Sequence, residues 1–503
     1  MDGDRFPSGN SMSASITAER SAVLRVPADA AETQDAVADA GVHVARVGPT
    51  GIASLHPLVT ATLDGRTAFY PRCSPERAAD VAARLEAETL ADGAAAVVSH
   101  DPGTATLPRP DVDGLDVGTP RLLGGAGWRP PADPDDHAAA GGFADASADD
   151  VADATATLLG RGWGDWCHDE PLGDCWETLD AADRSPAVVV NAHGTAADAL
   201  LCESVPFEVL EGATMAARVL GADRIVVYLS TADEAAVEAV REAVAAYPDP
   251  PVQIDVVTGP AVYRAGEPTM ALEAIEGNHR LEARLQPPGS VPTLDGQPTV
   301  VHTARTLAQL ALAVRTGEAP ETRLVTVTGD VASPATVELS ADATLDRTLD
   351  AVDLPNGFRA AAVGGRFGGL TDSLAVAPTP AALAEAGLGT DGTVEVLGED
   401  RCVLAFAGRR TRVAAETNCG RCVPCREGST QLAELLRDVY DRDFDPEAIA
   451  ELARTMAGAS VCAFGVEAAR PARTAVADFE AEVAAHADGR CPAGACTEPA
   501  EVT

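Results

Sequence analysis

The chain contains no lysine: all 37 of its basic residues are arginines, against 77 aspartates and glutamates, and the formal net charge is −40. So acidic a surface repels polyanions, and neither nucleic acid nor an anionic lipid surface is an expected partner. Repulsion among the acidic groups opposes compaction at low ionic strength, whereas salt screens it. The composition therefore indicates a halophilic protein.

Long apolar runs are also missing. No run reaches the roughly 18 residues that a membrane-spanning helix requires, so direct membrane insertion is not expected. The N-terminal segment MDGDRFPSGNSMSAS lacks the apolar core of a signal peptide. These features predict a cytoplasmic protein.

The 11 cysteines are odd in number and scattered, which argues against a disulfide framework. Cys167, Cys175 and Cys202 are expected to be buried free thiols. Cys491 and Cys496 could bind a metal together with a partner protein, but a flexible C-terminal tail is the expectation for them.

The length and the alternation of patterns predict an α/β protein of several domains. Residues 1–20 and 486–503 are predicted tails. Between them we expect a small α/β domain (21–101), a linker with one helix (102–157), a domain of alternating strands and helices (158–318), a β-rich module of the ubiquitin-like kind (322–400) and a helical domain (401–485).

The most specific motif is a run of cysteines in the helical domain. Cys419, Cys422 and Cys425 have the spacing Cys-x-x-Cys-x-x-Cys, and Cys462 follows at a distance within SVCAFG. Three closely spaced thiolates and one remote thiolate form the ligand shell typical of a [4Fe–4S] cluster. Structural zinc is the alternative, but zinc sites generally use paired short spacings.

The segment from Asn418 to Gly428, NCGRCVPCREG, followed by SVCAFG, closely resembles the iron–sulfur signature of the NADH-binding flavoprotein subunits of respiratory complex I and of NAD(P)-linked hydrogenases and formate dehydrogenases. VTVTGDVASPATVEL resembles the start of that family's soluble-ligand-binding β-grasp domain. Residues 21–101 resemble its thioredoxin-like domain in layout, but Cys73 stands alone there. The resemblance implies an electron-transfer subunit working with other redox subunits, placed at the inner face of a membrane only through those partners.

Segments of residues 158–318 resemble the family's FMN site. The resemblance places FMN between the glycine loop after Leu159, the strand ending at Asn191 and two later segments. The residues that it implies for FMN binding are Gly160, Arg161, Gly162, Gly164, Asn191, Tyr263, Gly266, Glu267, Val301, His302, Thr303 and Thr306. The same resemblance implies NAD(H) as a substrate nucleotide, and no catalytic side chain is named, because the cofactors carry the redox chemistry.

The sequence departs from the family at several of these places. Trp163 and Trp166 lie in the loop where the family has small residues, and Cys175 replaces a lysine before a tryptophan. The acidic loop that clasps NADH in the family is replaced by residues 193–198. Two functions therefore remain open: an FMN-containing electron-transfer subunit, or an adaptor that keeps the cluster but has lost flavin and NADH. A third possible function is that of an interaction module held together by a zinc ion.

Overall fold

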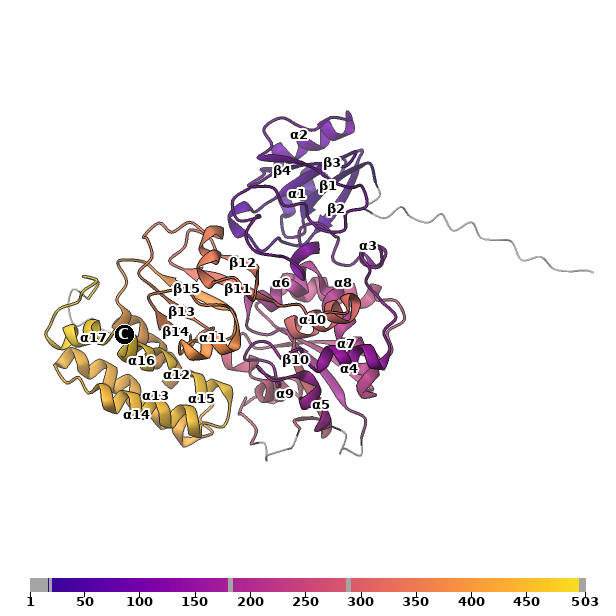
Figure 1. Ribbon diagram of the computed structural model, residues 1–503. Coiled ribbons are helices and arrows are strands. Elements are labelled where there is room, and N and C mark those ends of the chain that lie inside the picture. Colours follow the sequence, from indigo (N-terminus) through magenta and orange to yellow (C-terminus); the bar gives the residue numbers. More distant parts are fainter. Residues whose placement is uncertain (1–16, 18–19, 180–183, 286–290, 497–503) are drawn as a thin grey trace, which may run out of the picture.

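The computed structural model describes residue 17 and residues 20–179, 184–285 and 291–496. The described chain forms three five-stranded sheets in sequence order, followed by a group of helices (Figure 1). The predicted α/β architecture of several domains is confirmed. The predicted N-terminal tail lies almost entirely outside the described residues. None of the described helices is long and apolar enough to cross a bilayer.

The first sheet has the strand order β2-β1-β3-β4-β5 and lies at the top of Figure 1. β1 pairs parallel with β2 and antiparallel with β3, and β4 continues the sheet as the second arm of a hairpin. Ser74 caps helix α2 by accepting a hydrogen bond from the Arg77 amide, and Pro75 occupies the first turn of that helix. The elements are β1 (Ala22–Pro27), α1 (Ala31–Ala36), β2 (His43–Val47), β3 (Val59–Leu63), β4 (Arg66–Tyr70), α2 (Pro75–Glu86) and β5 (Ala96–Ser99).

The segment after the first sheet, expected to be a linker, is packed between the three sheets. One carboxylate oxygen of Glu338 accepts hydrogen bonds from the backbone amides of residues 121–123 at 2.7–3.1 Å. The guanidinium carbon of Arg25 lies 3.5 Å from the ring centroid of Trp128, which is buried. The segment therefore holds the first sheet against the rest of the molecule. It contains α3 (Pro134–Ala139) and is followed by α4 (Ala148–Thr155) and α5 (Leu172–Glu177).

The second sheet has the order β8-β7-β6-β10-β9, with four parallel strands and β9 antiparallel at the edge. Its inner strands read as continuous apolar runs because helices cover both faces. Helix α7 ends where Gly221 adopts the left-handed conformation, with φ of 63°. The elements are β6 (Ala187–Asn191), α6 (Ala196–Ser204), α7 (Pro206–Leu220), β7 (Arg224–Ser230), α8 (Glu234–Ala246), β8 (Gln253–Gly259), α9 (Pro268–Ile275), β9 (Thr293–Leu294), β10 (Gln297–Thr303) and α10 (Ala304–Thr316).

The third sheet, of order β12-β11-β15-β13-β14, lies between the second sheet and the C-terminal helices in Figure 1. Its elements are β11 (Thr322–Gly329), β12 (Ala335–Ser340), β13 (Ala360–Val363), β14 (Gly369–Thr371), α11 (Pro380–Glu385) and β15 (Thr393–Leu397). The helices that follow are α12 (Val403–Thr417), α13 (Val423–Asp438), α14 (Pro446–Ala459), α15 (Ala463–Glu467), α16 (Arg470–Asp478) and α17 (Glu480–Ala487).

The described part of the predicted C-terminal tail is packed rather than free. Cys491, Ala493 and Cys496 contact the apolar core of the helical domain, which includes Leu436 and Val439. The expectation of a flexible tail is therefore wrong for residues up to 496. The short, polar sequence after α17 carries no pattern that would predict contact with this core.

A buried ionic network fastens α7 to the segments around it. Glu208 of α7 accepts hydrogen bonds from Arg129 at 2.9 Å and Arg315 at 2.7 Å, and its side chain is 4% exposed. Burial opposes the charged form of Glu208, but the attraction of the two arginines and of His137 outweighs it and lowers the pKa of Glu208 to about 2. This carboxylate therefore contributes stability that is present above its ordinary pKa of about 4.5 and is lost as pH falls towards 2.

Replacing Glu208 with glutamine should lower the free energy of unfolding by about 3 kcal/mol near neutral pH, because two half-buried arginines lose their closest charged partner. The variant should also lose less stability than the native protein between about pH 4.5 and about pH 2. Chemical denaturation at fixed salt measures both effects. Asp80→Asn, in the exposed pair with Arg77, is the control and should change stability by less than about 1 kcal/mol. If Glu208→Gln is less stable than the native protein by the same amount at both ends of this pH range, the stabilising role of the Glu208 charge is wrong.

Candidate iron–sulfur and flavin site

Three of the four predicted cluster cysteines lie at the starts of two helices, and the fourth lies in the loop before the first of them. Cys422 directly precedes α13, Cys425 lies in its first turn, and Cys419 lies in the loop after α12. Cys462 directly precedes α15. Cys425 is buried and the other three are half-buried. A helix start directs backbone N–H groups towards the thiolates, as an anionic cluster requires.

The four thiols lie close enough to perturb one another. Burial and the neighbouring thiols of Cys422 and Cys419 raise the pKa of Cys425 to about 12. Burial, the carboxylate of Glu267 and the thiols of Cys419 and Cys425 also raise the pKa of Cys462. As free groups these two thiols stay protonated at neutral pH, so they become ligands only when a positive centre replaces their protons.

The four sulfurs do not form a group as compact as a single zinc ion requires. Among the described residues, no three of these four cysteines have sulfur atoms that all lie within 4.8 Å of one another. A tetrahedral zinc ion with bonds of about 2.3 Å holds its sulfurs closer than that. A polynuclear iron–sulfur centre separates its thiolates further, since each binds a different iron.

Two neighbouring residues hold the cysteine loops in position. Asn418 donates from its side-chain amide to the carbonyls of Ala414 and Ala415 and accepts from the amide of Gly420 at 2.9 Å. Gly465 allows the second loop to approach the first, because a Cβ there would lie 2.6 Å from the Ser460 Cβ and 3.0 Å from the Cys425 Cβ. The sequence SVCAFG is thus explained by packing against Cys425.

The structure brings together the segments predicted to surround FMN. The Asn191 side-chain amide, at the end of β6, donates to the carbonyls of Gly164 and Gly266, each at 2.8 Å. This one side chain therefore joins the glycine loop to the segment before α9.

The glycine loop is also tied to the end of β10 and the start of α10. The Arg161 amide donates to the Thr306 hydroxyl at 2.8 Å, and the Thr303 hydroxyl donates to the Arg161 carbonyl at 2.7 Å. The Trp166 amide donates to the Val301 carbonyl at 2.8 Å, which joins the backbone of the loop to that of β10. All four predicted flavin segments thus meet, and the junction between them, here termed the crevice, is filled by side chains.

The remaining predicted residues bond mainly to the chain itself. Glu267 caps α9 by accepting hydrogen bonds from the amides of Thr269 and Met270 at 3.0 and 2.9 Å. His302 is fully buried: its Nδ1 lies 3.0 Å from an Asp165 oxygen, and its Nε2 accepts a hydrogen bond from the Trp176 indole at 2.9 Å. Burial opposes ionisation of Asp165, but His302 and surrounding hydrogen bonds outweigh it and lower the pKa of this carboxyl.

Trp163 lies in this crevice, next to Gly266. Its side chain is 1% exposed and stacks on Tyr263, with ring centroids 4.3 Å apart and an interplanar angle of 18°. Trp166 is half-buried and packs against apolar residues on both faces of the second sheet. An aromatic pair therefore fills the space next to the glycine loop where the resemblance places a flavin.

The glycines of the crevice are required by the chain's own packing. A Cβ at Gly164 would lie 2.8 Å from the Asn191 side chain and 2.9 Å from the Gly266 carbonyl. A Cβ at Gly266 would lie 2.7 Å from the His193 carbonyl. These glycines do not line an open cradle. In this arrangement the residues do not fit an FMN ring, and Trp163 would have to leave the crevice to admit one.

The loop also contains a disulfide, where the sequence predicts two free thiols. Cys167, in the segment before α5, is bonded to Cys175 within α5, and their Cα atoms are 6.0 Å apart. Cys202 is a free buried thiol, as expected. The spacing of eight residues gives no signal for the bond, because only the fold of the loop brings the two sulfurs together.

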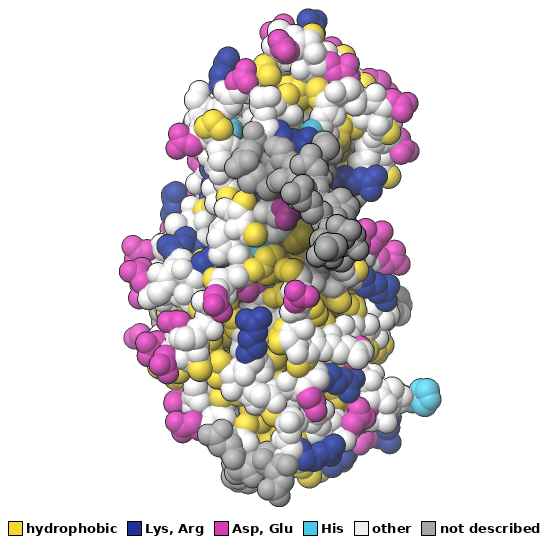
Figure 2. All heavy atoms as spheres, turned by 90° about the vertical axis from the view of Figure 1, so that its right-hand side faces the viewer, with side chains coloured by type: hydrophobic (Ala, Val, Ile, Leu, Met, Phe, Trp, Pro, Cys, Tyr) yellow, Lys and Arg dark blue, Asp and Glu magenta, His cyan; other side chains and the backbone are white. Residues whose placement is uncertain are grey.

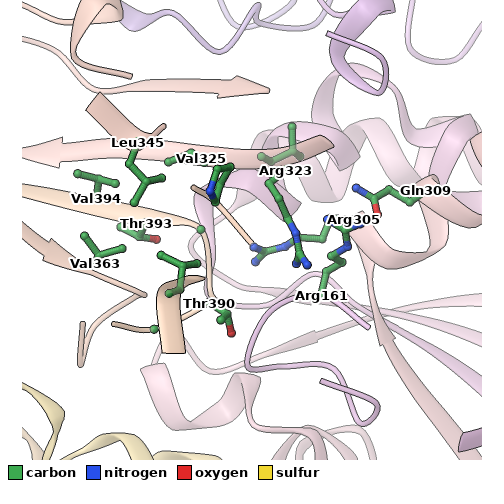
Figure 3. A pocket seen from close by; sticks show the side chains of 15 residues that line it. Arg161, Arg305, Gln309, Arg323, Val325, Leu345, Val363, Thr390, Thr393 and Val394 are labelled. Atoms are coloured by element: carbon green, nitrogen blue, oxygen red, sulfur yellow. The ribbon is translucent and has the colours of Figure 1, made fainter. Parts of the chain in front are cut away.

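Arg161 of the glycine loop, Arg305 of α10 and Arg323 of β11 line a small pocket beside the third sheet (Figure 3). Arg305 is paired there with Asp198 at 2.8 Å and Asp391 at 3.3 Å. Arg161 donates to the Thr322 carbonyl at 2.8 Å, and burial lowers its pKa. The space holds about 20 Å³, enough for about one water molecule. The pocket therefore accommodates no nucleotide in this arrangement.

An aromatic group joins the crevice to the cysteine loops. Tyr263, stacked on Trp163, lies 5.6 Å from Phe367 and 6.3 Å from Phe464 between ring centroids. Phe464 follows Cys462 by two residues, and Cys419 and Cys462 pack against the core formed by Ala265 and its neighbours. The predicted flavin segments and the predicted cluster ligands are therefore adjacent in space.

A second group of metal-binding side chains lies elsewhere in the helical domain. Cys402, His486, Cys491 and Cys496 place their ligand atoms within 4.8 Å of one another. The short spacing of Cys491 and Cys496 is the available signal in the sequence. Cys402 and His486 cannot be identified as metal ligands from the sequence, because only the fold of the helices brings them to these two cysteines.

Comparison with known proteins gives two matches to family models. Residues 170–312 match the Nuo51 FMN-binding domain, and residues 405–486 match the NADH-ubiquinone oxidoreductase-F iron–sulfur binding region. The first match begins after the glycine loop that contains Trp163. The second includes all four predicted cluster cysteines.

Several proteins are similar to this chain in sequence or in fold. The F subunit of the NADH-quinone oxidoreductase of Streptomyces coelicolor is 29% identical over 379 residues, covering 67% of this chain and 82% of its own length. A second such F subunit, from Rhizobium meliloti, is 29% identical over 385 residues, covering 67% and 88%. A crystal structure of an NAD+-reducing [NiFe]-hydrogenase matches in fold, with a TM-score of 0.60 and 23% identity over 92% of this chain and 85% of that one. The chain is therefore similar to the NADH-quinone oxidoreductase F subunits, and its match to the FMN-binding domain is followed by its match to the iron–sulfur binding region.

Proposed function

We propose that the protein is an electron-transfer subunit of a dehydrogenase complex, and that Cys419, Cys422, Cys425 and Cys462 bind one [4Fe–4S] cluster. The observation that carries the proposal is the convergence of these cysteines within the region that matches the iron–sulfur model. Three thiolates at the starts of two helices and one in the loop before them provide the anionic, hydrogen-bonding shell that such a cluster needs.

The protein's part in electron transfer is to hold the cluster and tune its surroundings. Glu267 lies near enough to Cys462 to raise the pKa of that thiol, so its carboxylate also opposes extra negative charge on a cluster bound there. The aromatic residues between the crevice and the cysteines exclude water from that side. We infer that electrons leave through the exposed side of the cysteine loops to a redox partner subunit.

We infer that FMN, expected from the match over residues 170–312, would occupy the crevice beside Asn191 and Gly266 after Trp163 rotates outwards. The Trp163 Nε1 and the His193 Nδ1 are buried without a hydrogen-bond partner, which favours another arrangement in which they are satisfied. The proposal includes NAD(H) binding, although residues 193–198 replace the acidic loop that clasps NADH in the family. When bound, FMN exchanges electron pairs for single electrons.

A second candidate function is an adaptor that holds the cluster but binds no flavin. The observation that favours it is the stack of Trp163 on Tyr263, which fills the crevice. In this case electrons would enter the cluster from one partner subunit and leave to another.

Flavin and iron contents of the anaerobically purified protein separate the two candidates. We expect about four irons per chain in both cases. About one FMN per chain, released by denaturation, would establish the flavin-containing subunit. Its absence from the native protein would favour the adaptor, while absence of both iron and FMN would contradict the proposed function itself.

Replacing Trp163 with glycine tests whether this side chain blocks the flavin. We expect the variant to bind added FMN at least about 10-fold more tightly than the native protein, because the ring no longer has to be displaced from its stack. Equilibrium dialysis measures the change. Trp128→Phe, at a buried tryptophan beside the first sheet, is the control and should leave FMN affinity unchanged. Equal affinities in Trp163→Gly and the native protein would show that Trp163 does not close the site.

We also infer the remaining features of the family. Residues 21–101 would be a thioredoxin-like domain without a cluster, and residues 322–400 a soluble-ligand-binding β-grasp domain. The protein would act in the cytoplasm and reach a membrane only through partner subunits. The relatives are named as subunits, which supports redox partners for this chain.

A further inference from the structure

The C-terminal group of Cys402, His486, Cys491 and Cys496 is distinct from the proposed cluster ligands. Cys402 lies directly before α12, His486 lies in α17, and the two other cysteines follow α17. Cys402 and His486 are each 3% exposed, whereas Cys491 and Cys496 are half-buried. All four ligand atoms lie within 4.8 Å of one another, and the Cys402 sulfur is 3.3 Å from the His486 Nε2.

The donor set and its compactness match a single ion. Three thiolates and one imidazole are a common ligand set for structural zinc, which prefers tetrahedral sulfur and nitrogen donors. With bonds of about 2.0–2.3 Å, a tetrahedral zinc brings its ligand atoms to within about 4 Å of each other. The described geometry needs little adjustment to reach that spacing.

The histidine is already oriented to bind a metal. Its Nδ1 lies 2.8 Å from the backbone carbonyl of Glu482, and because a carbonyl only accepts, Nδ1 must be the donor. The neutral ring then carries its lone pair on Nε2, the atom that faces the Cys402 sulfur. This carbonyl partner is the kind of outer contact that fixes the tautomer of metal-bound histidines.

Further donors point at the sulfurs. The backbone amide of Ala405, in the first turn of α12, donates to the Cys402 sulfur at 3.3 Å. The Tyr440 hydroxyl lies 3.7 Å from the Cys496 sulfur, and its ring packs edge-on against His486. Donors of this kind stabilise thiolates rather than thiols. A group of protonated, apolar cysteines would not need these hydrogen-bond donors.

We propose that Cys402, His486, Cys491 and Cys496 bind one structural zinc ion. Four protein ligands complete its coordination, so no open position is left for a substrate. The ion ties the segment after α17 to the start of α12. Helix α12 ends at Thr417, two residues before Cys419, so the zinc would anchor the opposite end of the helix that leads into the iron–sulfur loop.

Metal analysis of the full-length protein, purified anaerobically without added zinc or an affinity tag that binds metal, tests the proposal. We expect about one zinc per chain in addition to iron. Cys496→Ser and His486→Ala should each lower zinc at least about 10-fold while leaving iron unchanged. Cys73→Ser, at a buried free thiol in the first sheet's domain, is the matched control and should keep the zinc. Undiminished zinc in both ligand variants would overturn the assignment.

Cobalt gives a second readout that does not depend on folding of the variants. After removal of zinc by a chelator, Co2+ added to the native protein should give the visible bands of tetrahedral thiolate coordination. Cys462→Ala should still bind zinc and Co2+ here, which separates this ion from the proposed iron–sulfur site. Failure of the folded native protein to bind either metal, or a Cys491–Cys496 disulfide in the protein as purified, would also overturn the proposal.

Discussion

Replacing Cys462 with alanine should remove the iron–sulfur cluster from an otherwise folded protein. The variant should lose most of the roughly four irons per chain and the EPR signal of the reduced cluster, because one iron of the cubane no longer has a protein ligand. This is the largest effect expected of any single substitution. Only the turn before α15 supplies the fourth thiolate, and Gly465 packs that turn directly against Cys425.

Iron analysis and EPR spectroscopy on anaerobically purified protein measure this loss. Cys202→Ala, at a fully buried free thiol in the second sheet's domain, is the control. It should keep both iron and the EPR signal while losing some stability through a small cavity. An unchanged iron content and EPR signal in Cys462→Ala would remove this residue from the ligand set.

The melting temperature of the protein should rise by at least about 10 °C between low salt and molar KCl, because the folded chain concentrates a net charge of −40. The Debye length falls from roughly 30 Å at 0.01 M to roughly 3 Å at 1 M, so salt removes most of the repulsion between exposed carboxylates. Figure 2 shows acidic side chains spread over the face that it presents, with arginines interspersed among them.

Calorimetry over a series of KCl concentrations measures the salt effect. Sucrose provides the control, since it also favours the compact state but does not screen charge. The rise should be much smaller with sucrose. A melting temperature that does not change with KCl would show that the acidic composition is not an adaptation to high salt.

Elements whose residues repeat a clear pattern can be predicted from the sequence. The hairpin of β3 and β4, the buried strand β6 and the long helix α13 follow from alternation, apolar runs and helical spacing. The cysteine spacing around Cys422 specifies the iron–sulfur region because such ligands are close in sequence. The comparisons confirm that resemblance.

Contacts between distant segments cannot be predicted in the same way. The stack of Trp163 on Tyr263 depends on two residues 100 positions apart, and no local pattern specifies it. The disulfide of Cys167 and Cys175 depends on the path of one loop. The resemblance attributes the glycines next to Trp163 to a flavin, although they are needed for the close approach of Asn191 and Gly266.

EPR spectroscopy of the native protein, purified anaerobically and reduced with dithionite, tests most directly whether it carries electrons on the proposed cluster. We predict a signal of spin one-half, absent from the oxidised protein, that integrates to about one spin per chain and accompanies about four irons. A protein with no iron and no signal on reduction, and with zinc bound at Cys419, Cys422, Cys425 and Cys462, would contradict the proposed function.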